Sequence, residues 1–266
     1  MEKLTEEGVF RLFPDFEFKN HIATSGDAFI YKVGHADYDY DLALKVNYNI
    51  DPNSVARFKK EAHIFNCLDH EYVMKMLASG SREGWCFTLM KYIEYDLLKL
   101  IASQRFSDMQ AGLMVCKIAS ALHYLHTKGI LHRDIKPANV MITECGSPKI
   151  IDLGLAYIAG EDLNALEAVG SEGYAAPEIW DSPEKISIQS DLYALGALLY
   201  TVLTEVYPDP HKVDFGKLFN RDQGYVRFIL KAMNRDATQR HTSAHEFLEE
   251  LEELVSKILK PTSFLF

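Results

Sequence analysis

The sequence contains few cysteines, tryptophans and prolines. Of its 266 residues only four are cysteine, two are tryptophan and nine are proline. No two cysteines form a Cys-x-x-Cys pair, and none lies at metal-ligand spacing with histidine, so a zinc site is not expected. We predict that the thiols are free in the core of a protein from a reducing compartment. The cysteines are Cys67, Cys86, Cys116 and Cys145.

Basic residues and long apolar runs are also scarce. Lys and Arg number 28 against 38 Asp and Glu, giving a formal net charge of -10. An acidic chain is poorly suited to a phosphate backbone, so nucleic acid is not the expected main partner. The longest apolar stretch, Leu192 to Leu203, falls well short of the roughly 20 residues of a membrane helix. With no signal-like apolar N-terminus, we expect a soluble, intracellular (cytoplasmic) protein without a membrane span.

Ordinary globular composition and regular patterns make up the rest of the sequence. Hydrophobic residues are 48% and charged residues 25%, which excludes intrinsic disorder. The length fits one large domain or two small lobes. Ala28–Val33 and Leu42–Val46 are β-type runs, and Val55–Leu68 has helical spacing. Two more strands are predicted at 73–78 and 85–92, around a turn at 79–84.

Helical patterns dominate after about Tyr95. Ser107 followed by Gln110 predicts a capping box, and Gly129 fits the end of that helix. Ser190 is predicted to cap a buried helix over 191–204. A last helix is expected at about 243–259. These patterns predict a small sheet-rich lobe, a short hinge and a larger helical lobe.

The densest group of chemically active side chains is His132-Arg-Asp-Ile-Lys-Pro-Ala-Asn139. It is followed by Asp152-Leu-Gly154 and by Ala176-Pro-Glu178. This set, in this order, resembles the eukaryotic protein kinase family, with its catalytic loop, metal-binding D-x-G and A-P-E motifs. The resemblance covers roughly residues 16–254.

The resemblance implies an α+β, two-lobed protein kinase fold. The smaller N-lobe would be an antiparallel sheet with one helix, and the larger C-lobe would be helical. We expect an N-terminal extension over 1–15, a kinase domain over 16–260 and a short apolar tail over 261–266. Within the domain, the N-lobe would cover about 16–90, the hinge 91–95 and the C-lobe 96–260.

The same motifs imply the catalytic groups. Phosphoryl transfer depends mainly on positioning and charge neutralisation. Asp134 would orient the attacking hydroxyl and accept its proton, and Lys136 would reach the transferring phosphate. Asn139 and Asp152 would supply oxygen ligands to Mg²⁺, which prefers such donors. His132 is expected to pack and hydrogen-bond without taking part in the chemistry.

The resemblance also implies an ATP site. Lys45 matches the strand lysine that holds the α- and β-phosphates, and Glu61 matches its partner on a helix. Met90 matches the gatekeeper, the segment from Lys91 to Ile93 matches the hinge that binds adenine, and Asp96 is expected near the ribose. The implied nucleotide-binding residues are Ala23, Ser25, Gly26, Ala28, Ile30, Ala43, Lys45, Glu61, Met90, Lys91, Ile93, Asp96 and Met141.

The glycine-rich loop of the family is the main departure. The usual glycines fall on Ala23, Ser25 and Ala28, and only Gly26 remains, at an off-motif position. Glycine lets the backbone approach phosphate without a Cβ in the way. Asp27 lies at the tip, where a carboxylate would repel a triphosphate. We therefore predict weakened ATP affinity rather than its loss.

The activation segment contains no Ser or Thr between Leu155 and Gly170. Arg133 matches an arginine that commonly meets a phosphate on this segment, and Glu167 lies where a phosphothreonine is often found. Our hypothesis is that Glu167 pairs with Arg133 and keeps the segment active without phosphorylation. A carboxylate has less charge than a phosphate, so the mimicry would be partial. A solvated acid is the alternative interpretation.

Two further features bear on the type of kinase. Ser171 matches the substrate-facing position of Ser/Thr kinases, and Lys136 also favours that branch. Glu178 is expected to pair with Arg240, and Asp191 to bind the catalytic-loop backbone, which small-molecule kinases of related fold generally lack.

The leading interpretation is a serine/threonine protein kinase that uses ATP and Mg²⁺ on a protein substrate. The first alternative is a weakly active or inactive scaffold, favoured by the degenerate glycine loop. The second is a small-molecule kinase. For the tail, Phe264 and Phe266 suggest local packing or a partner contact.

Overall fold

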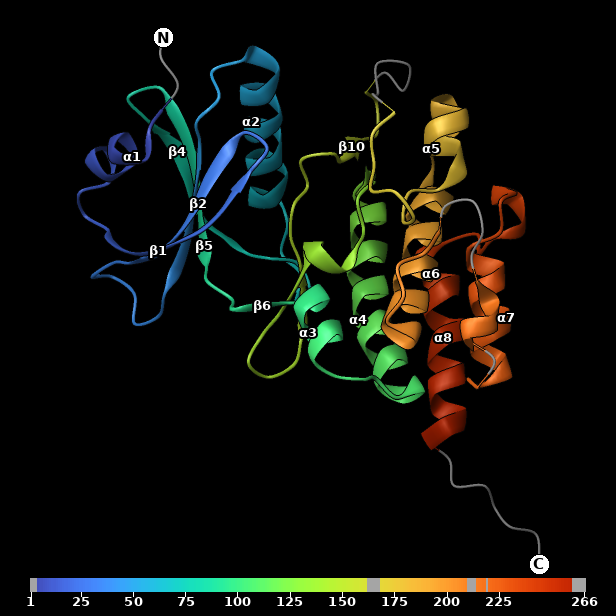
Figure 1. Cartoon of the computed structure of the whole chain (residues 1–266). Coiled ribbons are helices and arrows are strands. Elements are labelled where there is room, and N and C mark those ends of the chain that lie inside the picture. The colour runs from blue at the N-terminus through green and yellow to red at the C-terminus, as the bar shows by residue number, and fades with distance from the viewer. Residues whose placement is uncertain (1–3, 162–167, 210–213, 219, 260–266) are drawn as a thin grey trace, which may run out of the picture. The chain divides into compact units, whose positions relative to one another are not determined.

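The computed structural model describes residues 4–161, 168–209, 214–218 and 220–259. The chain divides into two compact units, Met1–Glu94 and Tyr95–Phe266. The first is built on an antiparallel sheet and the second mainly on helices (Figure 1). This is the predicted α+β organisation.

The sheet of the first unit has five antiparallel strands in the order β1-β2-β3-β5-β4. The strands are β1 (Glu17–Ser25), β2 (Ala28–Gly34), β3 (Leu42–Asn47), β4 (Met76–Arg82) and β5 (Trp85–Lys91). The predicted turn at 79–84 is too long, because β4 continues to Arg82. The turn is the pair Glu83-Gly84, whose φ angles of 49° and 88° suit a tight hairpin. The strand at β1 was not predicted.

One face of this sheet is covered by the N-terminal segment. The short helix α1 (Glu6–Leu12) is capped by Thr5, and Val9 and Phe13 are fully buried. They pack against alternating residues of β3, Leu42, Leu44 and Val46. The described part of the predicted extension, residues 4–15, therefore contributes an additional helix and part of the core of the first unit.

The second helix, α2 (Pro52–Asn66), packs on the opposite face of the sheet (Figure 1). Asp51 caps it by accepting hydrogen bonds from the amides of Asn53 and Ser54. Phe58 is buried there against Ala28 of β2 and Cys86 of β5. The predicted helix over 55–68 is confirmed, but it begins and ends earlier.

The second unit is built around a group of buried helices. Its helices are α3 (Leu97–Ser103), α4 (Asp108–Thr127), α5 (Pro177–Asp181), α6 (Ile188–Thr204), α7 (Gln223–Ala232) and α8 (Ala244–Leu259). The most extensive helix–helix contacts in this unit are those of α4 with α8 and α6, and of α6 with α7. Short strands form two small sheets: β6 (Tyr95–Asp96), β8 (Val140–Ile142) and β9 (Pro148–Ile150), and β7 (Ile130–Leu131) with β10 (Tyr157–Ile158).

Local signals set the ends of the two central helices. The capping box of Ser107 and Gln110 begins α4, as predicted, and Gly129 follows its end with φ 71°. The predicted cap at Ser190 is wrong, because α6 begins three residues earlier and Ser187 is its N-cap. Ser190 lies inside the first turn, where its hydroxyl accepts from the amide of Ser187.

The four cysteines agree only in part with the prediction. The four thiols are free, as predicted, but only Cys86 and Cys116 are buried, so the core assignment is wrong for Cys67 and Cys145. Burial raises the pKa of Cys116 to about 12.

Within the described residues, every helix is too short or too polar to cross a bilayer.

Candidate active site

The backbone at the start of the loop 132–139 is held by a buried carboxylate. Asp191, on α6, accepts hydrogen bonds from the amides of His132 at 2.9 Å and Arg133 at 2.8 Å. These bonds confirm the predicted contact with the loop backbone. Arg133 has φ 67°, a left-handed conformation that is costly for a residue with a Cβ. The carboxylate of Asp191 therefore fixes a backbone turn that local preferences oppose.

His126 is a part of this arrangement that sequence reasoning missed. Its Nε2 lies 2.8 Å from Asp191 Oδ2, and both side chains are buried. Burial favours the neutral form of Asp191 and would raise its pKa. The hydrogen bond and charge of His126 outweigh this effect, so the pKa of Asp191 lies below its usual range. The two residues are 65 positions apart, so no local pattern pointed to the pair.

His132 is fully buried beside the loop that it begins. Its Nδ1 accepts a hydrogen bond from the amide of Asp134 at 3.3 Å. Burial lowers the pKa of this imidazole, which keeps it neutral and able to accept. This geometry agrees with the predicted packing and hydrogen-bonding role.

Asp134 is the centre of a tight polar cluster. Its Oδ1 accepts the hydroxyl of Ser171 at 2.6 Å, and its Oδ2 lies 2.8 Å from both Lys136 Nζ and Asn139 Nδ2. The amine of Lys136 also donates to Ser171 Oγ at 2.6 Å. The fold thus brings together three predicted residues of the loop and one of the activation segment.

Asn139 and Asp152 are brought close by neighbouring strands. Asn139 lies just before β8 and Asp152 just after β9, and the amide of Ile151 donates to the Asn139 carbonyl at 2.9 Å. The amide nitrogen of Asn139 is used on Asp134, which leaves its side-chain oxygen as the atom suited to a cation. Asp152 has φ 65°, and Leu153 behind it is fully buried.

The oxygen donors of Asn139 and Asp152 fit Mg²⁺ better than a metal that is coordinated entirely by protein side chains. One carboxylate and one amide oxygen are hard ligands, and Mg²⁺ commonly combines one or two such groups with phosphate oxygens. In the described part of the chain, no cluster of three or more His, Cys, Asp or Glu side chains could hold a metal alone. A cation here would therefore depend on oxygens from a phosphorylated ligand.

The activation segment is anchored at its C-terminal end. Arg240 makes two hydrogen bonds to Glu178, at 2.7 and 2.9 Å, and Ser190 donates to the same carboxylate at 2.8 Å. The predicted pair is confirmed. Burial disfavours the charge of Glu178, but the bonds and charge of Arg240 prevail and hold its pKa below the usual range.

Arg133 also binds this segment, because its Nη1 donates to the Leu155 carbonyl at 3.2 Å. Glu167 lies outside the described residues. Its predicted pairing with Arg133 therefore stays a prediction.

In the first unit, the sheet register places seven predicted nucleotide-binding residues on one face. Directly opposed residues in antiparallel pairs share a face, as do alternate residues along a strand. The pairs Ala23 with Ile30, Ile30 with Lys45, and Ala43 with Met90 connect four strands. Residues on this face are Ala23, Ser25, Ala28, Ile30, Ala43, Lys45 and Met90.

Lys45 is held on that face by α2. Its Nζ donates to both carboxylate oxygens of Glu61, at 2.9 and 2.8 Å. Glu61 is buried and Lys45 is largely so, which shields the pair from solvent. The predicted pairing is confirmed.

The tip of the β1–β2 hairpin differs from the predicted picture. Gly26 and Asp27 form a two-residue turn, with Gly26 at φ 40°. The carboxylate of Asp27 accepts from Asn49 at 2.6 Å and from Arg57 at 3.1 Å. The hydrogen bond from Asn49, followed by Ser54 and Arg57, lowers the pKa of Asp27. The negative charge of Asp27 is therefore compensated by Arg57 and Asn49. Repulsion of a triphosphate by this carboxylate is accordingly weaker than the sequence predicts.

The remaining predicted residues lie in or close to β5, β6 and β8. Lys91 ends β5, and Ile93 follows it outside any strand. Asp96 and Met141 face each other in the β6–β8 pair. Asp96 also caps α3, accepting from the Lys99 amide at 2.7 Å, so part of its carboxylate is used structurally.

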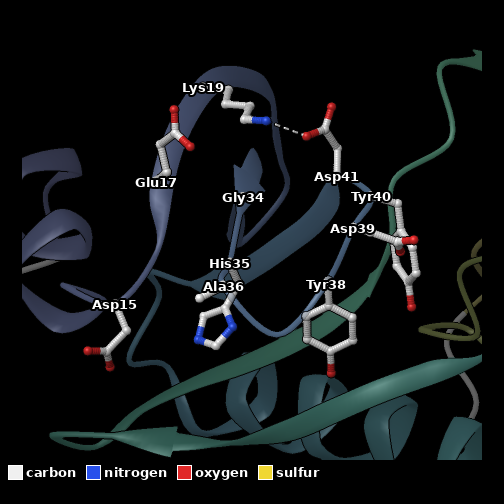
Figure 2. A pocket seen from close by; sticks show the side chains of 10 residues that line it. All are labelled: Asp15, Glu17, Lys19, Gly34, His35, Ala36, Tyr38, Asp39, Tyr40 and Asp41. Carbon is white, nitrogen blue, oxygen red and sulfur yellow. Dashed lines mark hydrogen bonds and ion pairs between the residues drawn. The ribbon is translucent and has the colours of Figure 1, made fainter.

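A separate polar cavity of about 570 Å³ lies at the other end of β2 (Figure 2). Figure 2 shows the amine of Lys19 directed at Asp41, 2.6 Å away. None of the predicted site residues lines it. The lining residues are Asp15, Glu17, Lys19, Gly34, His35, Ala36, Tyr38, Asp39, Tyr40 and Asp41.

Comparison with known proteins gives the family of the chain. A family model described as "Protein kinase domain" matches residues 16–264. The chain belongs to the protein kinase family. This match covers the predicted domain, including the predicted site residues of the first unit and those of the second unit.

The kinase also resembles curated proteins. It is 28% identical over 261 residues to a Clostridium perfringens protein named "Probable serine/threonine-protein kinase", covering 90% of this chain and 38% of that protein. An "Aurora kinase" of Candida glabrata is 31% identical over 242 residues, covering 87% and 66% of the two chains. A "Serine/threonine-protein kinase" of Streptomyces coelicolor, likewise named as probable, is 30% identical over 234 residues, covering 79% and 35%. The chain thus spans little more than a third of the two bacterial relatives.

Proposed function

We propose that this kinase transfers the γ-phosphate of ATP to serine or threonine hydroxyls of protein substrates, with Mg²⁺ as cofactor. The observation that carries the proposal is the contact of Ser171 with Asp134 and Lys136. A serine hydroxyl already donates to Asp134 Oδ1 at 2.6 Å while Lys136 Nζ contacts its oxygen. A substrate hydroxyl bound in the same way would meet a proton acceptor and a positive charge together.

The roles of the residues follow from their chemistry. Asp134 orients the acceptor hydroxyl and takes its proton, and Asn139 holds Asp134 in place. Lys136 stabilises negative charge on the transferring group. Lys45, fixed by Glu61, holds nucleotide phosphates.

Asn139 and Asp152 would hold Mg²⁺. When bound, the ion supplies charge neutralisation for the phosphate oxygens. We include in this proposal that the kinase is active without phosphate on its activation segment, because no Ser or Thr lies between Leu155 and Gly170.

Incubation with labelled ATP, Mg²⁺ and generic protein substrates tests the proposal. We expect label on Ser or Thr, reduced about 10²- to 10⁴-fold in Asp134→Asn, which removes the proton acceptor. Asp152→Ala should abolish transfer. Asp181→Ala removes an exposed acid of the same unit and should leave the rate unchanged.

Other outcomes favour other functions. Absence of turnover together with no nucleotide-dependent melting shift would indicate a scaffold. Turnover only with a small-molecule acceptor would indicate a small-molecule kinase, which the Glu178–Arg240 pair disfavours.

A further inference from the structure

The tip of the β1–β2 hairpin is bonded to the start of α2, which no predicted role explains. Asp27 Oδ2 lies 3.1 Å from Arg57 Nη2, and its Oδ1 accepts from Asn49 Nδ2 at 2.6 Å. Asn49 in turn accepts, through its own side-chain oxygen, the amide of the N-cap residue Asp51 at 3.0 Å. A short chain of hydrogen bonds therefore runs from the turn to Asp51, the residue that caps the helix.

Backbone contacts reinforce this attachment. The Asp27 carbonyl accepts from the amide of Tyr48 at 2.9 Å, and the Tyr48 hydroxyl donates to the carbonyl of Gly26 at 2.5 Å. The turn is thus held by both its side chain and its main chain.

Arg57 lies four residues before Glu61, so the two side chains belong to one face of α2. Glu61 binds Lys45 of β3, and Arg57 binds Asp27 of the hairpin tip. Two ion pairs, one helical turn apart, therefore join α2 to the sheet. The first pair involves the proposed phosphate-holding lysine, and the second holds the turn beside Ser25 and Ala28 of the same face.

We propose that Asp27 and Arg57, with Asn49, are positioning residues that fix the hairpin tip to α2 and so hold the nucleotide-binding face ready for ATP. This inference rests on the proposed function. It reverses the effect predicted for Asp27 from charge alone. A carboxylate that only repelled phosphate would weaken ATP binding, whereas one that holds the hairpin strengthens it.

Steady-state kinetics and hydrogen exchange on the full chain test the proposal. In Asp27→Ala and in Arg57→Ala, we expect the KM for ATP to rise about three- to tenfold with kcat within about twofold, as for a partly exposed charged contact. Without nucleotide, amides of residues 25–28 and 48–57 should exchange faster. The charge-reversed double variant, Asp27→Arg with Arg57→Asp, should recover part of the affinity.

Lys59→Ala is the matched control, since it removes one positive charge from an exposed position of the same helix. It should change neither KM nor exchange. A KM for ATP that is unchanged or lower in Asp27→Ala would overturn the proposal, as would exchange equal to that of Lys59→Ala or a double variant without recovery. If the unaltered chain transfers no phosphate, the proposed function fails, and the exchange experiment alone decides the attachment.

Discussion

At the scale of single residues, two buried carboxylates of the second unit, those of Asp191 and Glu178, are each held by several partners. Asp191 is surrounded by His126 and two backbone amides, and Glu178 by Arg240 and Ser190. A buried ion costs several kcal/mol to desolvate, so removing one partner leaves a large penalty on the other. These side chains fix the loop that carries Asp134 and the segment that carries Ser171.

The Glu178–Arg240 pair gives a stability prediction. Glu178→Ala leaves the Arg240 guanidinium buried and unpaired, and should lower the free energy of unfolding by about 3–5 kcal/mol. Chemical denaturation measures this loss. Glu184→Ala, an exposed acid nearby, should change it by less than about 0.5 kcal/mol. Equal effects of the two substitutions would mean that the pair has no stabilising role.

The same pair predicts a pH dependence with a definite sign. The pKa of Glu178 is lower in the folded than in the unfolded chain, so its stabilisation is present above the ordinary glutamate pKa of about 4.3 and is lost as pH falls. Melting midpoints from pH 6 down to about pH 3 should therefore fall more steeply for the unaltered protein than for Glu178→Gln. Parallel curves would contradict the assignment.

At the scale of elements, α1 shows how the sheet of the first unit is completed. A sheet with two apolar faces needs cover on both. Helix α2 covers the face that carries Lys45, and α1 with Phe13 covers the other. Arg82 holds the end of α1 through the Leu12 carbonyl at 2.9 Å and packs on the ring of Phe13.

Truncation of this cover should destabilise the first unit. Phe13 is fully buried, so Phe13→Ala should lower the free energy of unfolding by about 3–5 kcal/mol. Thermal melting measures the effect, with exposed Glu7→Ala as control. An unchanged melting midpoint in Phe13→Ala would show that the side chain of Phe13 does not stabilise this core.

At the scale of the whole molecule, the proposed phosphate-holding groups occur in both units. Lys45 and Glu61 belong to the first, and Asn139 and Asp152 to the second. In the proposed function, positive charge supplied by Lys45, Lys136 and Mg²⁺ would offset the net charge of -10 where phosphate binds, because local rather than total charge acts at short range.

The proposed function predicts that nucleotide binding stabilises the fold and depends on each of the proposed phosphate- and metal-holding residues. At 100 times its Kd, MgATP should stabilise the chain by about 2.7 kcal/mol and raise the melting midpoint by roughly 5–10 °C. Lys45→Met and Asp152→Ala should each remove most of that shift. A full shift in either variant would exclude that residue from nucleotide binding. EDTA should reduce the shift in the unaltered protein.

The sequence alone determined the features that depend on local pattern and residue order. The catalytic-loop octet, the D-x-G and the A-P-E predicted the family, and the Ser107 capping box and Gly129 predicted the bounds of α4. The pairs Lys45–Glu61 and Glu178–Arg240 followed from the resemblance. Tertiary structure decided what depends on residues distant in the chain: the cover supplied by α1, the contact of His126 with Asp191, and the attachment of Asp27 to Arg57. Sequence spacing predicted a repulsive charge at Asp27, because only the fold brings a compensating guanidinium from 30 residues away.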